Sequence, residues 1–162
     1  MIFWQTFLDS LRLPSKKAVF KLNRSGMDIT VIYMFMLIFL VQLPVMINQI
    51  AHPTGVAASL NILFMLIYVF MFSYLPLTIM VFIALSIIAY IGTFITRIMQ
   101  RKLRFSILWK MSAYATTIPL LLYALISFMY PLGDHCMLLI IIYVFLFLIK
   151  IISIYPKRRK RN

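Results

Sequence analysis

The sequence predicts an all-helical integral membrane protein, a bundle of four transmembrane helices with one further apolar segment that is re-entrant or lies at the outer interface. Hydrophobic residues make up 64% of the 162 residues and charged residues only 12%, whereas a soluble domain carries about 25% charged residues. The charges are also segregated, because no Asp, Glu, Lys or Arg lies between Asp28 and Arg97. The apolar stretches are continuous rather than alternating, which indicates helices and not a barrel. These observations exclude a soluble enzyme, a disordered tail and a DNA-binding domain.

Residues 1–28 are predicted to form a cytoplasmic amphipathic helix followed by a basic connector. Five apolar residues recur at helical spacing: Ile2, Phe3, Phe7, Leu8 and Leu11. Gln5, Asp9 and Arg12 lie on the opposite side, and Pro14 ends the pattern. Such a helix lies on the membrane surface with its apolar side in the lipid. The basic connector occupies residues 15–28.

The transmembrane helical domain is predicted over residues 29–155. A span needs about 20 apolar residues to cross about 30 Å of hydrocarbon. Stretches of this length lie at 29–50, 111–131 and 136–155. The remaining parts are an outer loop at 51–55, a basic cytoplasmic loop at 97–110, a tight outer turn at 132–135 and a basic cytoplasmic tail at 156–162.

The positions of the sixteen basic residues predict how the chain is oriented. All except Lys150 fall into three clusters, at 12–24, 97–110 and 157–161, and the two outer loops contain none. The positive-inside rule places basic loops in the cytoplasm. Both termini are therefore expected on the cytoplasmic side of the membrane.

The apolar run at 56–96 is too long for this topology. As one helix it would measure about 60 Å at 1.5 Å per residue, which is enough for two crossings. In the first solution, 76–96 spans while 56–74 lies at the outer interface or enters and returns, which gives four spans. In the second, a turn near Ser73–Pro76 gives five spans and places the N-terminus outside. The first solution keeps every basic cluster in the cytoplasm.

The residues that could carry chemistry are few. Asp134, His135 and Cys136 are consecutive in a turn, which does not place a nucleophile and a base within reach of each other. A metal site there would need more ligands, and only His52 could join from the other outer loop. Lys150 lies close enough to the end of its span for its ammonium group to reach the cytoplasmic headgroups. No catalytic residue, metal ligand or cofactor is predicted.

The polar residues inside the spans allow two interpretations, and the prolines allow one. Gln42, Asn48, Gln49 and Asn61 could line a polar path for a solute, although such residues more often hold helices together or lie at an interface. Prolines within the spans are expected to kink or end their helices. These prolines are Pro44, Pro76 and Pro119.

Small residues predict a close contact between two helices near the cytoplasmic side. Small-xxx-small spacing lets helix backbones approach each other, and it occurs near the end of 76–96 and near the start of 111–131. The predicted packing residues are Ala89, Gly92, Thr93, Thr96, Ser112, Ala113, Thr116 and Thr117.

The basic clusters are expected to bind anionic lipid headgroups and to orient the chain, because juxtamembrane Lys and Arg are each worth about 1 kcal/mol near such a surface. The aromatic interleaving of a nucleic-acid-binding surface is missing. The predicted lipid-contacting residues are Lys16, Lys17, Lys21, Arg24, Arg97, Arg101, Lys102, Arg104, Lys157, Arg158, Arg159, Lys160 and Arg161.

Two stretches resemble a family of uncharacterised bacterial multi-span membrane proteins, some of which are labelled maltodextrin-utilisation proteins. The first is FLDSLRLPSKKAVFKLNRSGMDITVIY (7–33), and the second is KLRFSILWKMSAYATTIP (102–119). The broader similarity is to small multi-span proteins of the Yip type. Members of the family usually carry a sizeable extracytoplasmic region after the first span, where this chain has only AHPTG. The resemblance implies the plasma membrane of a Gram-positive bacterium and supplies no catalytic residues.

The leading functional hypothesis is a non-enzymatic accessory or regulatory protein, which acts through helix contacts with a larger envelope or transport system or with further copies of itself. The alternative is a transport protein that moves a small solute through its own helical bundle. An enzyme is disfavoured because the chain holds only three acidic residues and no base–nucleophile pair.

Overall fold

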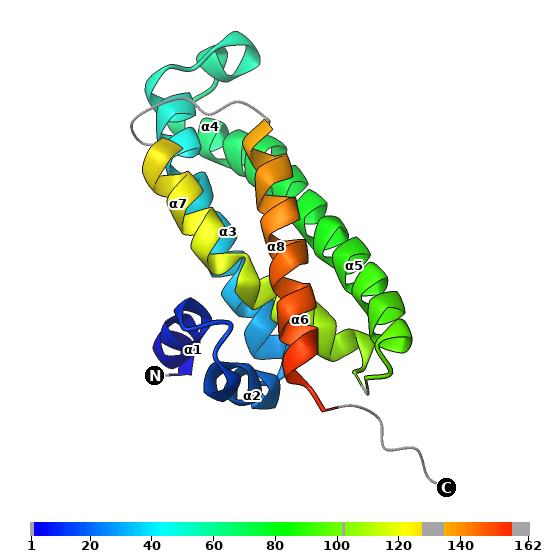
Figure 1. Ribbon diagram of the computed structural model, residues 1–162. Helices are drawn as coiled ribbons and strands as arrows, with labels where there is room; N and C mark the ends of the chain where they lie inside the picture. The colour runs from blue at the N-terminus through cyan, green and yellow to red at the C-terminus, as the bar shows by residue number, and fades with distance from the viewer. Residues whose placement is uncertain (1, 102, 128–134, 157–162) are drawn as a thin grey trace, which may run out of the picture.

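In the computed structural model, three helices are long and apolar enough to cross a membrane, and they lie side by side with a further apolar helix (Figure 1). The structure describes residues 2–101, 103–127 and 135–156, and within these ranges the secondary structure is helical. The three candidates are Met27–Ala51, Ile62–Ile98 and Phe105–Ser127, and the described apolar part of the fourth helix, Leu138–Ile154, is shorter.

Two short helices precede the first candidate span. Helix α1 covers Ile2–Leu11 and α2 covers Lys16–Arg24. The Oγ atom of Ser15 caps α2 by accepting a hydrogen bond from the backbone N–H of Ala18, which satisfies one of the free donors of the first turn. The predicted basic connector is thus largely a second amphipathic helix, whose apolar side is buried against the bundle while its lysines face outward.

Helix α3 (Met27–Ala51) agrees with the span predicted at 29–50 and continues through Pro44. A turn follows, in which Gly55 has a φ of 60°, a conformation that costs glycine little because it has no Cβ. The 3-10 helix η1 covers Gly55–Ser59. The turn and η1 lie at the end of the bundle opposite to α1 and α2 (Figure 1).

The long apolar run forms one continuous helical segment with a change of winding inside it. Helix α4 (Ile62–Val69) leads into a π-helical turn, η2 (Phe70–Tyr74), and then into α5 (Leu75–Ile98). Proline lacks an N–H and its ring crowds the preceding turn, and the wider π turn lies directly before Pro76. The chain does not reverse near Ser73–Pro76, so the five-span alternative is wrong at this point, and the segment does not enter and return.

The third candidate span is broken in the middle. Helix α6 (Phe105–Ala115) and α7 (Thr117–Ser127) meet at Thr116. Pro119 has no N–H to donate to the carbonyl of Ala115, which explains why the regular helix stops there. The helix starts earlier than the predicted span at 111–131, so the basic loop is shorter than 97–110. Every residue from Leu108 to Thr117 is buried, which makes this segment the centre of the bundle.

Helix α8 (His135–Ile154) follows the boundaries predicted for the last span. It packs against α5, α6 and α7, while α6 also contacts α2, α3 and α5. Its C-terminal end lies beside α2, where the rings of Phe20 and Tyr155 are 5.4 Å apart. The helix ends next to the basic tail, which lies outside the described residues.

Candidate functional site

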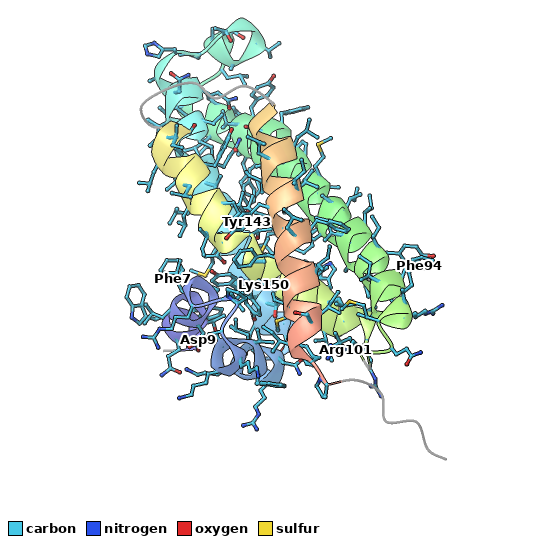
Figure 2. All side chains as sticks on the ribbon, in the orientation of Figure 1. Phe7, Asp9, Phe94, Arg101, Tyr143 and Lys150 are labelled. Atoms are coloured by element: carbon cyan, nitrogen blue, oxygen red, sulfur yellow. The ribbon has the colours of Figure 1, made fainter. Side chains whose placement is uncertain are left out.

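The described basic residues of the first two clusters lie at one end of the molecule, which we call the basic end. It consists of α2, the C-terminal end of α5 with the connector residues 99–101 and 103–104, and the C-terminal end of α8 (Figure 1). Lys16, Lys17, Lys21, Arg24, Arg97 and Arg104 are exposed there, and Arg101 is half-buried. Figure 2 shows Arg101 at this end. Lys102 and the predicted residues of the tail (Lys157, Arg158, Arg159, Lys160 and Arg161) lie outside the described residues. The arrangement brings the clusters together around one rim of the bundle.

Lys110 departs from the sequence prediction, because it is buried rather than part of an exposed basic loop. Its side chain is 7% exposed. The Nζ atom donates hydrogen bonds to the backbone carbonyls of Asn23 and Ser25, at 2.8 and 2.9 Å. These carbonyls lie at the C-terminal end of α2, where helical carbonyls lack partners and a positive charge is favoured. Lys110 therefore fastens α2 to the central helix.

Six hydroxyl side chains close to Lys110 join segments that are far apart in the sequence. We call these side chains the hydroxyl cluster. Its members are Ser10, Ser25, Thr30, Tyr33, Tyr114 and Thr117. They come from α1, the junction between α2 and α3, α3 itself, α6 and α7. Hydroxyl groups are both donors and acceptors, so the cluster satisfies polar groups that would otherwise be buried without partners.

Two tyrosines are the centres of the hydroxyl cluster. The hydroxyl of Tyr33 lies 3.0 Å from Oγ of Ser10 and 2.8 Å from Oγ1 of Thr117. The hydroxyl of Tyr114 lies 2.8 Å from both Oγ of Ser25 and Oγ1 of Thr30. The two rings pack at a centroid distance of 5.6 Å. Sequence reasoning missed this cluster because its bonds link residues up to 89 positions apart.

Helix α1 is oriented by this cluster in an unexpected way. Its polar side faces the protein, since Thr6, Asp9 and Ser10 are at most 8% exposed. Asp9 pairs with Lys21 of α2 at 2.7 Å, and Figure 2 shows Asp9 between α1 and α2. Several apolar side chains of α1 are exposed instead, and they are Phe3, Trp4, Leu8 and Leu11. The apolar side of α1 is therefore exposed, and its contact with lipid stays a prediction.

The predicted packing residues occupy two different contacts. Ala89, Gly92 and Thr96 of α5 are buried and Thr93 is half-buried. A Cβ built on Gly92 would lie 2.7 Å from Cδ2 of Leu148 in α8 and 3.7 Å from Cδ2 of Leu108 in α6, so the missing side chain allows both helices to approach α5.

The second group of small residues lies around the α6–α7 break and contacts α3. Ser112, Ala113, Thr116 and Thr117 are all buried. Thr117 bonds with Tyr33, and Oγ1 of Thr116 lies 3.8 Å from Sδ of Met34. Among the described residues, Oγ of Ser112 has no hydrogen-bond partner. Helices α5 and α6 are thus in contact, with Gly92 on the α5 side, while Thr116 and Thr117 contact α3.

The remaining polar residues lie in two places, inside the bundle next to the π turn and exposed at the end opposite to the basic end. Gln42 is buried, and its Nε2 donates a hydrogen bond of 2.7 Å to Oγ of Ser73 in the π turn. Asn48, Gln49 and Asn61 are exposed at the end opposite to the basic end. The hydroxyl of Tyr74 donates to the backbone carbonyl of Phe35 at 3.1 Å. These bonds attach the π turn to α3.

The candidates for chemistry remain apart or undescribed. His52 is exposed at the end of α3, and Lys150 is exposed on α8; Figure 2 shows Lys150 in the lower half of that helix. Asp134 and the side chains of His135 and Cys136 lie outside the described part. Within the described ranges, no three His, Cys, Asp or Glu residues are close enough to hold a metal ion together.

Two hollows accompany these contacts. A cavity of about 260 Å³ lies between α3, α5, α7 and α8, and its walls are apolar apart from a few polar groups such as Gln42, Thr116 and Tyr123. An open groove of about 740 Å³ runs along the outer side of α5, bounded by Phe35 of α3 and Phe105 of α6. The groove is lined by apolar and aromatic side chains.

Helices of this length and hydropathy, with apolar side chains on the outside and hydroxyl groups on the inside, define a helical membrane protein. A family model described as "Protein of unknown function (DUF1189)" matches residues 49–152. The chain belongs to this uncharacterised family. The resembling stretch 102–119 lies inside the match and the stretch 7–33 lies outside it. No curated protein matches the chain significantly, and neither does any solved structure.

Proposed function

We propose that the protein is a non-enzymatic multi-pass protein of a bacterial plasma membrane, which acts as an accessory or regulatory partner of a larger envelope or transport system. One observation carries this proposal. In the apolar helix Ile62–Ile98 only 28% of an apolar stretch of 18 residues is buried, against 61% of a stretch of the same length in Phe105–Ser127. The protein therefore offers a long apolar helix surface that its own fold leaves uncovered.

We further propose four spans, with α8 as the fourth and both termini in the cytoplasm. Helix α8 has 20 residues, or about 30 Å of helix, which matches the hydrocarbon thickness. The grouping of the described basic residues at one end supports this orientation, since basic loops stay in the cytoplasm. The α4–α5 segment has 37 residues, or about 55 Å, so α4 and η2 extend beyond one crossing at the outer side.

The non-enzymatic part of the proposal is supported by how the buried polar groups are used. Lys110 donates to two backbone carbonyls, and the hydroxyls of Tyr33 and Tyr114 each have two partners. These groups are engaged in holding helices together.

Co-purification in mild detergent tests the accessory role. Tagged protein expressed in its own membrane is expected to retain one larger membrane protein at a fixed ratio. Replacing two exposed residues of the uncovered surface, Phe64→Ser and Phe72→Ser, is expected to release that partner. Matched replacements on α7, Leu122→Ser and Leu125→Ser, are expected to leave it bound. A chain that purifies without any stoichiometric partner would contradict the accessory role.

The cavity between α3, α5, α7 and α8 favours a second candidate, a small-solute transporter. Its few polar groups include the side chain of Gln42. Under this alternative, purified protein in liposomes conducts a solute by itself, and Gln42→Leu abolishes the flux. Flux from the purified protein alone would support transport and overturn the accessory role.

A further inference from the structure

The groove along α5 has the chemistry of an acyl-chain site. Its walls are mainly apolar and aromatic side chains, including Ile79, Phe82 and Ile83. Two of the three hydroxyl residues in the wall are already engaged: Thr78 donates to the carbonyl of Tyr74, and Ser86 donates to the carbonyl of Phe82 and accepts from Trp109. The third, Tyr90, lies at the end of the groove nearest the basic end. A ligand in the groove therefore meets few free polar groups. Its volume of about 740 Å³ lies within the range of about 300–1,000 Å³ that is typical of small-molecule sites.

The groove runs along α5 and is long enough for the acyl chain of a lipid in one membrane leaflet. Leu75 and Tyr90 lie at its two ends along α5, and the helical rise places them about 22 Å apart. One leaflet contributes about half of the 30 Å of hydrocarbon, so an acyl chain fits along the part from Ile79 to Tyr90, which is about 16 Å long. Tyr90, which is 74% exposed, lies at the end of the groove that is nearer to the basic end.

Positive charge lies beyond the groove at the basic end. Arg97 follows Tyr90 by seven residues, which is two helical turns, so both lie on the same face of α5 about 10 Å apart. On the other side of the groove, Arg104 directly precedes Phe105, whose side chain lines the wall. Both arginines are exposed. Arginine suits phosphate because its guanidinium group presents several donors.

We propose that this groove binds one anionic phospholipid, with an acyl chain along Ile79–Tyr90 and the phosphate between Arg97 and Arg104. The complementary charge favours an anionic lipid over a second copy of the chain, because a second copy would bring the same basic end to the same place. This inference goes beyond the proposed function, since it concerns a bound lipid and not a protein partner.

Native mass spectrometry of the detergent-purified protein tests the site with two lipid probes that share the same acyl chains, phosphatidylglycerol and phosphatidylcholine. The wild-type protein is expected to retain one phosphatidylglycerol and much less phosphatidylcholine. The double variant Arg97→Gln/Arg104→Gln is expected to lower the affinity for phosphatidylglycerol about 30-fold, at about fivefold for each arginine near an anionic group. Ile83→Trp, which fills the groove at an exposed position, is expected to remove both lipids.

A matched pair of basic residues on α2 provides the control. Lys16→Gln/Lys17→Gln lowers the net charge equally and removes two predicted contacts of the basic surface with the bilayer, but neither residue lines the groove. Retention of the single phosphatidylglycerol in the groove is therefore expected to stay within about twofold of wild type, because distant exposed charges are screened. If the control variant lost as much phosphatidylglycerol as Arg97→Gln/Arg104→Gln, the effect would come from overall charge, and the proposed site would be wrong.

Three further outcomes would also overturn the proposal. The first is equal retention of the two lipids by the wild type. The second is inorganic phosphate alone raising the thermal stability as much as phosphatidylglycerol does. The third is a lipid-free dimer that Ile83→Trp converts to a monomer, because a second copy would then occupy the groove. A failed partner pull-down would leave the lipid result intact, so the two proposals fail separately.

Discussion

Near the basic end of the bundle, hydrogen bonds join side chains of α1, α3, α6 and α7 and the C-terminal end of α2, whereas the opposite end, formed by η1, α4 and η2, mostly exposes large apolar side chains. Lys110 and the hydroxyl cluster fix the first region. In the second, Phe64 and Phe72 are 60% and 70% exposed, and Gln42 and Tyr74 link the π turn to α3. The difference indicates that the basic end maintains the fold, while the apolar end and α5 present surface to the membrane and its components.

Removing the charge of Lys110 is expected to have the largest effect. Lys110→Met leaves the carbonyls of Asn23 and Ser25 without their donor, and an unpaired buried group costs about 1–3 kcal/mol. We expect a loss of about 3 kcal/mol of stability and easier proteolysis at α2. Thermal unfolding in detergent measures the change, with the exposed Lys150→Met as the matched control. Equal behaviour of the two variants would mean that Lys110 does not hold α2.

Filling the position of Gly92 is expected to be the next largest change. A leucine there would collide with Leu148, whose Cδ2 atom lies only 2.7 Å from the position that a Cβ atom on residue 92 would occupy. Overpacking of a core costs about 1–3 kcal/mol. Gly92→Leu is therefore expected to unfold at lower temperature than Gly92→Ala. A Gly92→Leu protein as stable as the wild type would show that α5 and α8 do not approach closely.

The hydroxyl cluster can be weakened by removing a single hydroxyl group. Tyr114→Phe keeps the ring but removes the hydroxyl that bonds with Ser25 and Thr30, and we expect a loss of about 1–2 kcal/mol. Chemical denaturation compares it with Tyr123→Phe, a tyrosine outside the cluster. If both substitutions have the same effect, the cluster contributes nothing specific to the basic end.

The smallest effect is expected at the apolar end. Phe72→Ser removes an exposed ring whose centroid lies 4.8 Å from that of Tyr68, so stability in detergent is expected to change by no more than about 1 kcal/mol. The same variant is expected to lose the partner in co-purification. A large loss of stability would show that this end is part of the packed core, which would remove the contrast between the two regions.

The apolar helices were predictable because apolar runs of the length of a bilayer stand out between clusters of charge. Helices α3, α5 and α8 lie close to the expected ranges. The continuity from Ile62 to Ile98 was not predictable from length alone, because a run of that length fits either one bent helix or two spans.

The candidate site was largely hidden from sequence reasoning. Lys110 was expected in a basic loop, because its carbonyl partners Asn23 and Ser25 lie up to 87 positions away in the chain. Tyr33 and Tyr114 look like ordinary aromatic residues of apolar spans. The turned polar side of α1 was missed for the same reason, since periodicity identifies the two faces of a helix but not what each face contacts. The packing of Gly92 was suggested by its small size, but its partner on α8 was not.

Cysteine accessibility in intact cells tests the central claim that the hydrogen-bonded basic end faces the cytoplasm and the apolar end faces outward. On a Cys136→Ser background, single replacements at three exposed positions, Gln5→Cys, Ser59→Cys and Ser106→Cys, are treated with a membrane-impermeant maleimide. We expect Ser59→Cys in η1 to be labelled in intact cells, and the other two only after the membrane is permeabilised. Labelling of Gln5→Cys or Ser106→Cys in intact cells, or protection of Ser59→Cys, would contradict the account.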